Sequence, residues 1–255
     1  MNNLYSALLG SIALISPLVA KENLPETLKP EPHQRDPYHW QTRHEQVTQL
    51  NATIKPEYVI IGDSITHMWG GKPACQQFKP RAQASWDKLF GSHKVVNMGF
   101  GFDYVDNAYF RITDGELSKH QPRVIILLLG TNNIGHRKDK PQAVADNMNA
   151  MLNLLKTQCP QSKILLLSIL PRQEESLRNT IISTNKAYET LADNKKVFYL
   201  NLAPYLSTKE GTTDKQYFSD PVHINAKGYE QLVAPIAKKL SQIDPQYRPD
   251  KIKDA

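Results

Sequence analysis

The chain has 255 residues, of which 40% are hydrophobic and 22% are charged, and its formal net charge is +6. These values are ordinary for a globular protein that is long enough to bury a substantial core within one α/β-sized domain. The charge is spread thinly, with no run of five like charges, so we expect no nucleic-acid partner.

The chain begins with an apolar run over residues 4–20, which ends at Ala20 before the charged pair Lys21 and Glu22. The run is too short, and too closely followed by polar sequence, for a membrane-spanning helix. It resembles a secretory signal with a small residue at the cleavage point. We therefore expect residues 1–20 to be a signal peptide, cleaved near Ala20, and the mature protein to be secreted or periplasmic.

Residues 21–54 form an N-terminal segment that is first proline-rich and polar and then helical in pattern. The prolines predict irregular structure at its start. A helix over 38–50 then places Trp40, Val47 and Leu50 toward the core.

Five short apolar runs, typical of strands, follow within residues 55–243. The first is Tyr58–Ile61, which ends abruptly at Gly62, and the others lie at 94–97, 124–129, 163–170 and 197–200. The third run shows no polar alternation, which is typical of a central parallel strand covered on both faces.

Helical patterns alternate with these strands. One helix ends near Gly91, the next spans 141–158, another spans about 174–192, and the last contains 232–240. The alternation predicts a doubly wound, flavodoxin-like three-layer α/β/α domain over 55–243, with a five-stranded parallel sheet and right-handed crossovers. Residues 244–255 are expected to form a loose, polar C-terminal tail.

Polar residues follow the first three strands at the points where they end. Ser64 follows the first strand, the Gly99–Asp103 turn follows the second, and Asn132 follows the third. The carboxyl ends of parallel strands open onto one edge of the sheet, where ligands bind. For Ser64 an ordinary role as a helix N-cap is the competing interpretation.

A fourth polar segment, containing Asp220 and His223, lies just before the last helix. An Asp three residues ahead of a His can bend back and bond the imidazole, which fixes its tautomer and leaves the other ring nitrogen free to act as a base. A serine, a base and an orienting acid are what nucleophilic acyl transfer requires. The carboxamide of Asn132 and backbone amides near Ser64 and Gly101 could hold the developing oxyanion.

The second-strand turn can supply only backbone donors to an oxyanion hole. Gly101 can adopt a positive φ at little cost, whereas Phe102 rarely would. We therefore predict that Gly101 provides the flexibility of this turn and that the amide of Gly101 or Phe102 points at the oxyanion.

These segments resemble the SGNH, or GDSL-type, hydrolases, and the resemblance covers nearly the whole mature chain. Within that family the chain is most similar to the platelet-activating-factor acetylhydrolase-like esterases, through 111–117, 130–136 and 223–229. The four blocks that carry the family resemblance are Gly62-Asp63-Ser64-Ile65, Asn97-Met98-Gly99-Phe100-Gly101, Gly130-Thr131-Asn132-Asn133 and Asp220-Pro221-Val222-His223.

The resemblance implies Ser64 as the nucleophile, His223 as the general base and Asp220 as its partner, with Ser64 and Asn132 also serving the oxyanion hole. One departure concerns the second block, where many members have a glycine immediately before the acid and this chain has Phe102.

We expect an exported serine esterase that removes small acyl groups, acetyl above all, from an oxygen ester, with an acetylated saccharide as the preferred substrate. No set of side chains has metal-ligand spacing, so neither a metal nor a cofactor is expected. A lipid or lysophospholipid esterase is the alternative activity, and a non-catalytic ligand-binding protein on the same fold is the alternative class.

Other nucleotide-binding or hydrolytic folds fit less well. A dinucleotide site would use Gly99 and Gly101, but the third glycine of that fingerprint is missing. A flavin-binding protein would leave the Asp220–His223 spacing unexplained, and an α/β-hydrolase would need a Gly-x-Ser-x-Gly elbow, which does not occur.

Overall fold

The structure is a computed structural model that describes residues 24–33, 38–117 and 120–249. The apolar run expected to be a signal peptide lies outside the described residues.

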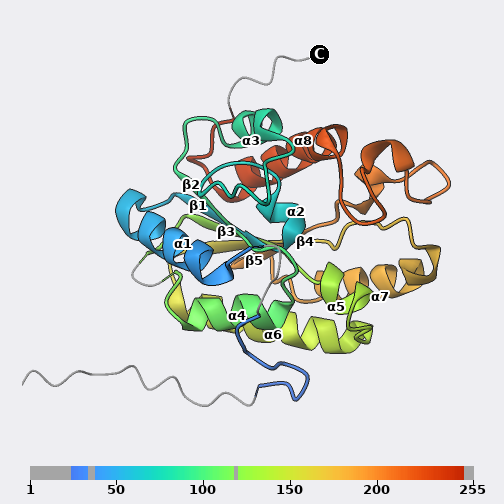
Figure 1. The fold of residues 1–255 in the computed structure, drawn as a ribbon, viewed down its shortest axis with the longest axis horizontal. Helices are drawn as coiled ribbons and strands as arrows, with labels where there is room; N and C mark the ends of the chain where they lie inside the picture. The colour runs from blue at the N-terminus through green and yellow to red at the C-terminus, as the bar shows by residue number, and fades with distance from the viewer. Residues whose placement is uncertain (1–23, 34–37, 118–119, 250–255) are drawn as a thin grey trace, which may run out of the picture.

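A five-stranded parallel sheet forms the centre of the protein (Figure 1). The strand order is β2-β1-β3-β4-β5, with every neighbouring pair parallel. This order and the helices on both faces confirm the predicted doubly wound, flavodoxin-like fold. The strands are β1 (Tyr58–Gly62), β2 (Val95–Gly99), β3 (Val124–Leu128), β4 (Lys163–Leu167) and β5 (Val197–Leu200).

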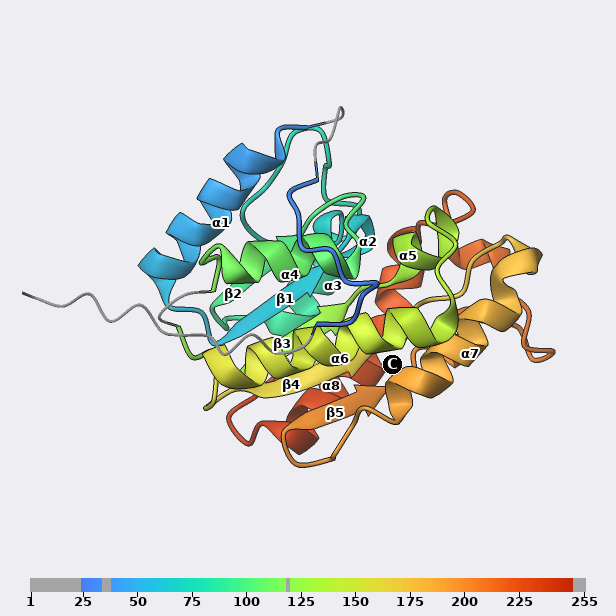
Figure 2. The ribbon, with the colours of Figure 1, turned by 90° about the horizontal axis from the view of Figure 1, so that it is seen from below.

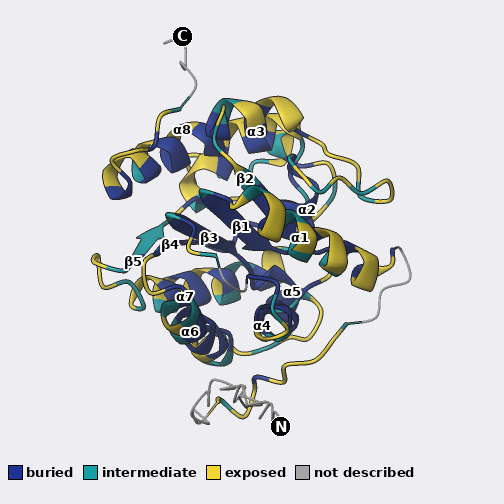
Figure 3. Cartoon of the chain, turned by 90° about the vertical axis from the view of Figure 1, so that its left-hand side faces the viewer, coloured by how far each residue is buried: buried dark blue, intermediate teal, exposed yellow. Residues whose placement is uncertain are grey.

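Helices cover both faces of the sheet in two separate hydrophobic layers, as Figures 1 and 2 show. On one face lie α3 (Gln83–Phe90) and α8 (Ala226–Ile243). On the other lie α4 (Val105–Thr113), α6 (Pro141–Gln158) and α7 (Arg178–Glu189), with α1 (Trp40–Ile54) against β2. Figure 3 shows the buried sheet between these layers and the exposed outer faces of the helices.

Short helical segments connect these elements. They are α2 (Ser64–His67), α5 (Thr131–Gly135), η1 (Glu175–Leu177), η2 (Ala203–Leu206) and η3 (Lys215–Tyr217). The first two begin at the carboxyl ends of β1 and β3, where the candidate site residues lie.

Helix α4 is the one long element that the sequence pattern did not predict. Its buried side includes Asp106, Asn107 and Arg111 as well as apolar residues, so the helical hydrophobic period is interrupted. These polar side chains are paired with other parts of the chain; for example, Arg137 donates to Asp106 at 2.9 Å. Pairing offsets the free-energy cost of burying these polar side chains. The partners lie in distant segments, so the local sequence does not reveal them.

The predicted loose tail is wrong for the first residues after α8. Tyr247 is buried, and its hydroxyl donates to the main-chain carbonyl of Leu89. Asp244 accepts from Arg123 at 2.9 Å and from the hydroxyl of Tyr58. These contacts fasten residues 244–247 to the amino-terminal end of the sheet.

Two glycines allow α2 to pack tightly against the ends of β1 and β2. Gly62 and Gly99 are register partners in the sheet. A Cβ at Gly62 would lie 1.9 Å from Oγ1 of Thr66, and one at Gly99 would lie 2.3 Å from the backbone nitrogen of His67. The absence of side chains therefore brings the turn after β1 directly against the turn after β2.

Candidate active site

Ser64 is the first residue of α2 and is almost completely buried. The N-cap of this helix is Asp63, whose carboxylate accepts from the N–H of Ile65 at 2.9 Å. The interpretation of Ser64 as the N-cap is therefore wrong. Burial raises the pKa of Asp63 to about 7, despite the hydrogen bond from Ile65.

The side chains of Ser64, His223 and Asp220 form a continuous hydrogen-bonded chain. Oγ of Ser64 lies 2.8 Å from Nε2 of His223, and Nδ1 of His223 lies 2.9 Å from each carboxylate oxygen of Asp220. Since the carboxylate accepts, Nδ1 carries the ring proton, and Nε2 is left as the acceptor for the hydroxyl of Ser64. The structure thus brings together three predicted residues that are up to 159 positions apart.

Asp220 holds its position through the backbone of its own turn. One carboxylate oxygen accepts from the N–H groups of Val222 at 2.9 Å and His223 at 2.8 Å. Burial alone would raise the pKa of Asp220, but these bonds and the bond from the His223 ring outweigh it, so the pKa lies below its usual value. Asp220 is therefore ionised at neutral pH.

Two opposing influences act on the imidazole of His223. Partial burial lowers its pKa, and the charges of Arg81 and Arg172 lower it further, whereas the neighbouring Asp220 carboxylate raises it. Together these influences place the pKa of His223 below its usual value. His223 is therefore neutral at neutral pH, which is the form that can accept a proton.

Arg81, which no sequence motif indicates, lies beside Asp220 and His223. Its Nη1 donates to Oγ of Ser219 at 2.6 Å and lies 3.7 Å from a carboxylate oxygen of Asp220. The residue stands in the loop before α3, where an isolated arginine has no motif around it. Arg81 comes close to Asp220 only because that loop packs against residues 219–220.

Asn132 occupies the start of α5, at the carboxyl end of β3, and its side chain is buried. Its side-chain amide donates to the main-chain carbonyl of Asp103 at 2.9 Å. One amide hydrogen is thus used to join the turn after β3 to the turn after β2, and the second is available to another acceptor.

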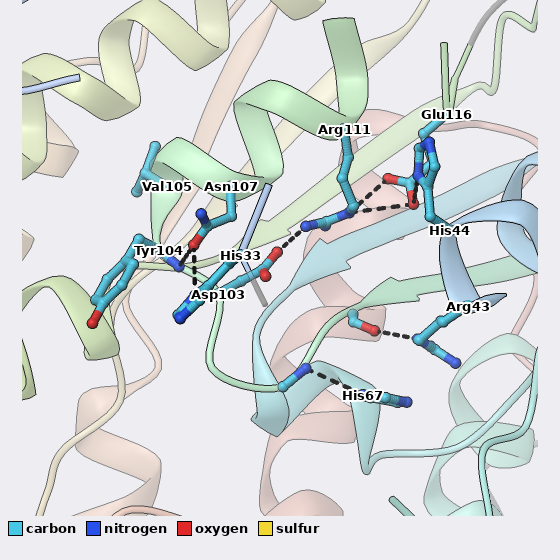
Figure 4. Close-up of polar contacts among 12 residues, drawn as sticks. His33, Arg43, His44, His67, Asp103, Tyr104, Val105, Asn107, Arg111 and Glu116 are labelled. Carbon is cyan, nitrogen blue, oxygen red and sulfur yellow. Dashed lines mark hydrogen bonds and ion pairs between the residues drawn. The ribbon is translucent and has the colours of Figure 1, made fainter. Parts of the chain in front are cut away.

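The turn after β2 is fixed by side chains from α1, α2 and the segment before α1, and Figure 4 shows the contacts of Arg43 and His67. Nε of Arg43 donates to the carbonyl of Gly99 at 2.7 Å, and the N–H of Gly101 donates to Nδ1 of His67 at 3.2 Å. The hydroxyl of Tyr38 donates to the carbonyl of Gly101 at 3.1 Å. Burial, reinforced by Arg43 and Arg111, lowers the pKa of His67 to about 2, so His67 remains a neutral acceptor.

The prediction about the backbone of this turn is wrong in one respect. Phe102, not Gly101, has the left-handed conformation, with φ of 68°. The N–H of Gly101 is engaged by His67, whereas the N–H of Phe102 has no hydrogen-bond partner among the residues that the structure describes. Gly101 is needed for space instead, because a Cβ there would lie 2.6 Å from the ring of Phe78.

A buried ion cluster lies directly behind the turn. Arg111 pairs with the carboxylate of Asp103, and its Nε lies 3.2 Å from Glu116. The guanidinium also lies 3.7 Å from the centre of the Phe100 ring. All of these side chains are buried, so the cluster fixes the position of Asp103. The main-chain carbonyl of Asp103 accepts the hydrogen bond from the side-chain amide of Asn132.

Known proteins share the sequence pattern and the fold. The sequence model of the GDSL-like Lipase/Acylhydrolase family matches residues 60–231, which include Ser64, Asn132, Asp220 and His223. The chain belongs to the GDSL-like lipase/acylhydrolase family. The predicted family is therefore confirmed, and the protein is a hydrolase of the esterase type.

Relatives of this acylhydrolase include the human platelet-activating factor acetylhydrolase IB subunit alpha1, which is 26% identical over 207 residues, or 80% of this chain and 82% of the relative. A GDSL-like lipase from Bacteroides thetaiotaomicron has a similar fold, with a TM-score of 0.61, 21% identity, and coverage of 80% of this chain and 99% of the other. A carbohydrate acetylesterase from Sinorhizobium meliloti matches with a TM-score of 0.52, 18% identity, and coverage of 73% and 98%.

The described residues contain neither a metal-binding cluster nor a membrane-spanning helix. Within 24–33, 38–117 and 120–249, no group of three or more His, Cys, Asp or Glu side chains is arranged to hold a metal ion. In the same part of the chain, no helix combines the length and the apolar character needed to cross a membrane.

Proposed function

We propose that this acylhydrolase is a serine esterase in which Ser64 is the nucleophile, His223 the general base and Asp220 the residue that orients the base. The observation that carries the proposal is the 2.8 Å contact between Oγ of Ser64 and Nε2 of His223, with Asp220 on the opposite ring nitrogen. A hydroxyl is a weak nucleophile until an adjacent base takes its proton, and this contact provides that base.

In the first step Oγ of Ser64 attacks the ester carbonyl carbon while Nε2 of His223 takes the hydroxyl proton. The resulting tetrahedral intermediate collapses when His223 returns this proton to the leaving alcohol, which leaves an acyl group on Ser64. A water molecule then attacks the acyl carbon while His223 takes its proton, and the carboxylic acid is released when His223 returns this proton to Oγ of Ser64. Asp220 stabilises the imidazolium that forms in each half-reaction.

The negative charge on the former carbonyl oxygen requires fixed donors. We assign this role to the backbone N–H groups of Ser64 and Phe102 and to the free amide hydrogen of Asn132. Ser64 opens a helix, so its N–H has no partner within the helix. The N–H of Phe102 likewise has no hydrogen-bond partner in the described part of the chain, whereas the amide of Gly101 donates to His67 and is not part of the hole.

We further propose that the acyl group is acetyl. Acetylhydrolases are named among the curated relatives of the chain, which supports a small acyl group. The alcohol is proposed to be a saccharide, and the mature enzyme is proposed to act outside the cytoplasm after cleavage near Ala20. The likeness to the carbohydrate acetylesterase concerns the fold alone, so the choice of a saccharide rests on the exposed ring of Phe102.

The experiment compares purified wild-type protein with Ser64→Ala on p-nitrophenyl esters of two, six and twelve acyl carbons. We expect kcat/KM to be highest for the acetyl ester and the variant to lose nearly all activity, by several orders of magnitude. A preference for the twelve-carbon ester would favour the lipid esterase instead. Absence of hydrolysis of every ester would favour a non-catalytic binding protein.

A further inference from the structure

Phe102 combines two features that do not serve folding. Its φ of 68° lies in the left-handed region, which favours glycine and disfavours a side chain with a bulky Cβ substituent. Its side chain is also 39% exposed, so the ring is not a core residue. A strained, exposed aromatic residue next to a catalytic centre is a candidate for contact with substrate.

The surrounding contacts fix the direction of this side chain. On one side Gly101 is bonded to His67 and Tyr38, and on the other Asp103 is bonded to Asn132. The ring of Phe102 also meets the ring of Phe78 nearly perpendicularly, with 6.2 Å between centroids. Because the backbone is held on both sides, the exposed ring of Phe102 stays on the turn whose N–H group is a proposed oxyanion donor.

The other ring at this turn is surrounded by polar groups. The ring of Tyr104 is stacked on the imidazole of His33, with 5.4 Å between centroids, and lies 4.8 Å from the guanidinium carbon of Arg137. Figure 4 shows Tyr104 and His33 beside the backbone of the 101–104 turn. The exposed ring of Phe102 thus shares its turn with hydrogen-bonding side chains, and this combination suits an alcohol that has both C–H and O–H surfaces, which is the chemistry of a sugar ring.

The depth of the site decides which part of the ester meets Phe102. Ser64 is only 6% exposed and Asn132 only 3% exposed. The reacting carbonyl and its small acyl group must therefore bind in the buried part of the site. The alcohol must then extend outward, and Phe102 is an exposed side chain on the turn that supplies a proposed oxyanion donor.

We propose that Phe102 is a specificity-determining residue whose ring packs against the face of a pyranose in the alcohol portion of the substrate. This inference rests on the proposed serine esterase function and adds the class of the alcohol. Phe102 thus has two separable contributions, since its backbone N–H serves the oxyanion and its side chain selects the alcohol.

The test compares kcat/KM for methyl tri-O-acetyl-xylopyranoside with kcat/KM for ethyl acetate, whose alcohol is too small to cover the ring. The variants are Phe102→Tyr, which keeps the aromatic face, Phe102→Leu, which keeps apolar bulk, and Phe102→Gly, which removes the side chain and suits the backbone. We expect the ratio of the two kcat/KM values to be preserved in Phe102→Tyr and to fall roughly tenfold in Phe102→Leu and Phe102→Gly.

Tyr205→Leu is the matched control. Tyr205 is 42% exposed but follows β5, at the opposite edge of the sheet from β2. In Tyr205→Leu the ratio of the two kcat/KM values should equal that of the wild type. Circular dichroism should confirm that every variant is folded. An unchanged ratio in Phe102→Leu and Phe102→Gly overturns the inference while leaving the esterase function in place.

If the Phe102 variants changed kcat/KM only for esters with longer acyl chains, the inference would also be overturned, since this result would place Phe102 beside the acyl group. Absence of ethyl acetate hydrolysis by the wild type, by contrast, is a failure of the proposed function itself.

Discussion

The side-chain amide of Asn132 donates a 2.9 Å hydrogen bond to the main-chain carbonyl of Asp103, which joins the turn after β3 to the turn after β2. This bond orients the remaining amide hydrogen of Asn132 and fixes the residue that follows Phe102. Asn132→Ala should therefore lower kcat by about 10²–10³ with little change in KM, because a fixed oxyanion donor acts mainly in the transition state. Steady-state kinetics on p-nitrophenyl acetate measures both constants. A near-normal kcat would show that the oxyanion hole is built from other groups.

The activity should depend on the neutral form of His223. Its pKa lies below the ordinary value of 6.5 because of burial and the charges of Arg81 and Arg172. Since protonation removes the acceptor for the Ser64 hydroxyl, kcat/KM should be constant near neutral pH and should fall as the pH drops through this lowered pKa. A profile of kcat/KM between about pH 4 and 8 tests this, and a midpoint above 7 would contradict it.

Arg81→Gln should move the pH profile of kcat/KM toward higher pH. The guanidinium lies 3.7 Å from Asp220 and disfavours the imidazolium form of His223, so its removal should raise the pKa of His223 and shift the acid limb to higher pH. Arg81→Lys keeps the charge and should restore much of the wild-type profile. An acid limb that stays in place in Arg81→Gln would show that Arg81 does not act on His223.

Gly101 should be intolerant of side chains for a steric reason. A Cβ at this position would lie 2.6 Å from the ring of Phe78, so Gly101→Ala should lower kcat by displacing the turn. Phe78→Ala removes the colliding ring, and the double variant should recover part of the activity lost in Gly101→Ala. Simple additivity of the two effects, measured as a double-mutant cycle in kcat/KM, would count against this explanation.

Arg111 should be important for stability as well as for the shape of the turn. Arg111→Met would leave the buried carboxylates of Asp103 and Glu116 without their partner, and we expect a loss of about 3–5 kcal/mol in the free energy of unfolding. Urea denaturation measures this loss. Arg111→Lys keeps the charge without the planar fork and should be intermediate. A loss of less than about 1 kcal/mol in Arg111→Met would contradict the account of the cluster.

The order of elements could be predicted because most strands and helices have regular hydrophobic patterns. Helix α6 and strand β5 have the predicted bounds, and β4 ends at Leu167 rather than at residue 170. Helix α4 could not be predicted, since Asp106 and Arg111 are buried through partners from distant segments. The burial of Tyr247 depends in the same way on Leu89 and on the packing of α8, which no local pattern reveals.

For the site, the residues that could be predicted are those that stand at strand ends or at a fixed short spacing. The contact between Ser64 and His223 required only that their segments open onto the same edge of the sheet. The conformation of Phe102 could not be predicted, because the general preference of glycine for positive φ is overridden here by bonds to neighbouring residues. Arg81 was missed because its partners, Ser219 and Asp220, are distant in sequence.

The most direct test of the central claim is covalent labelling with a fluorophosphonate, followed by mass spectrometry of the digested protein. If Ser64 is activated by His223, one adduct should form, on the peptide that contains Ser64. It should be absent in Ser64→Ala and should form far more slowly in His223→Ala. Labelling of a different serine, or esterase activity that survives in Ser64→Ala at a tenth of the wild-type rate or more, would contradict the account.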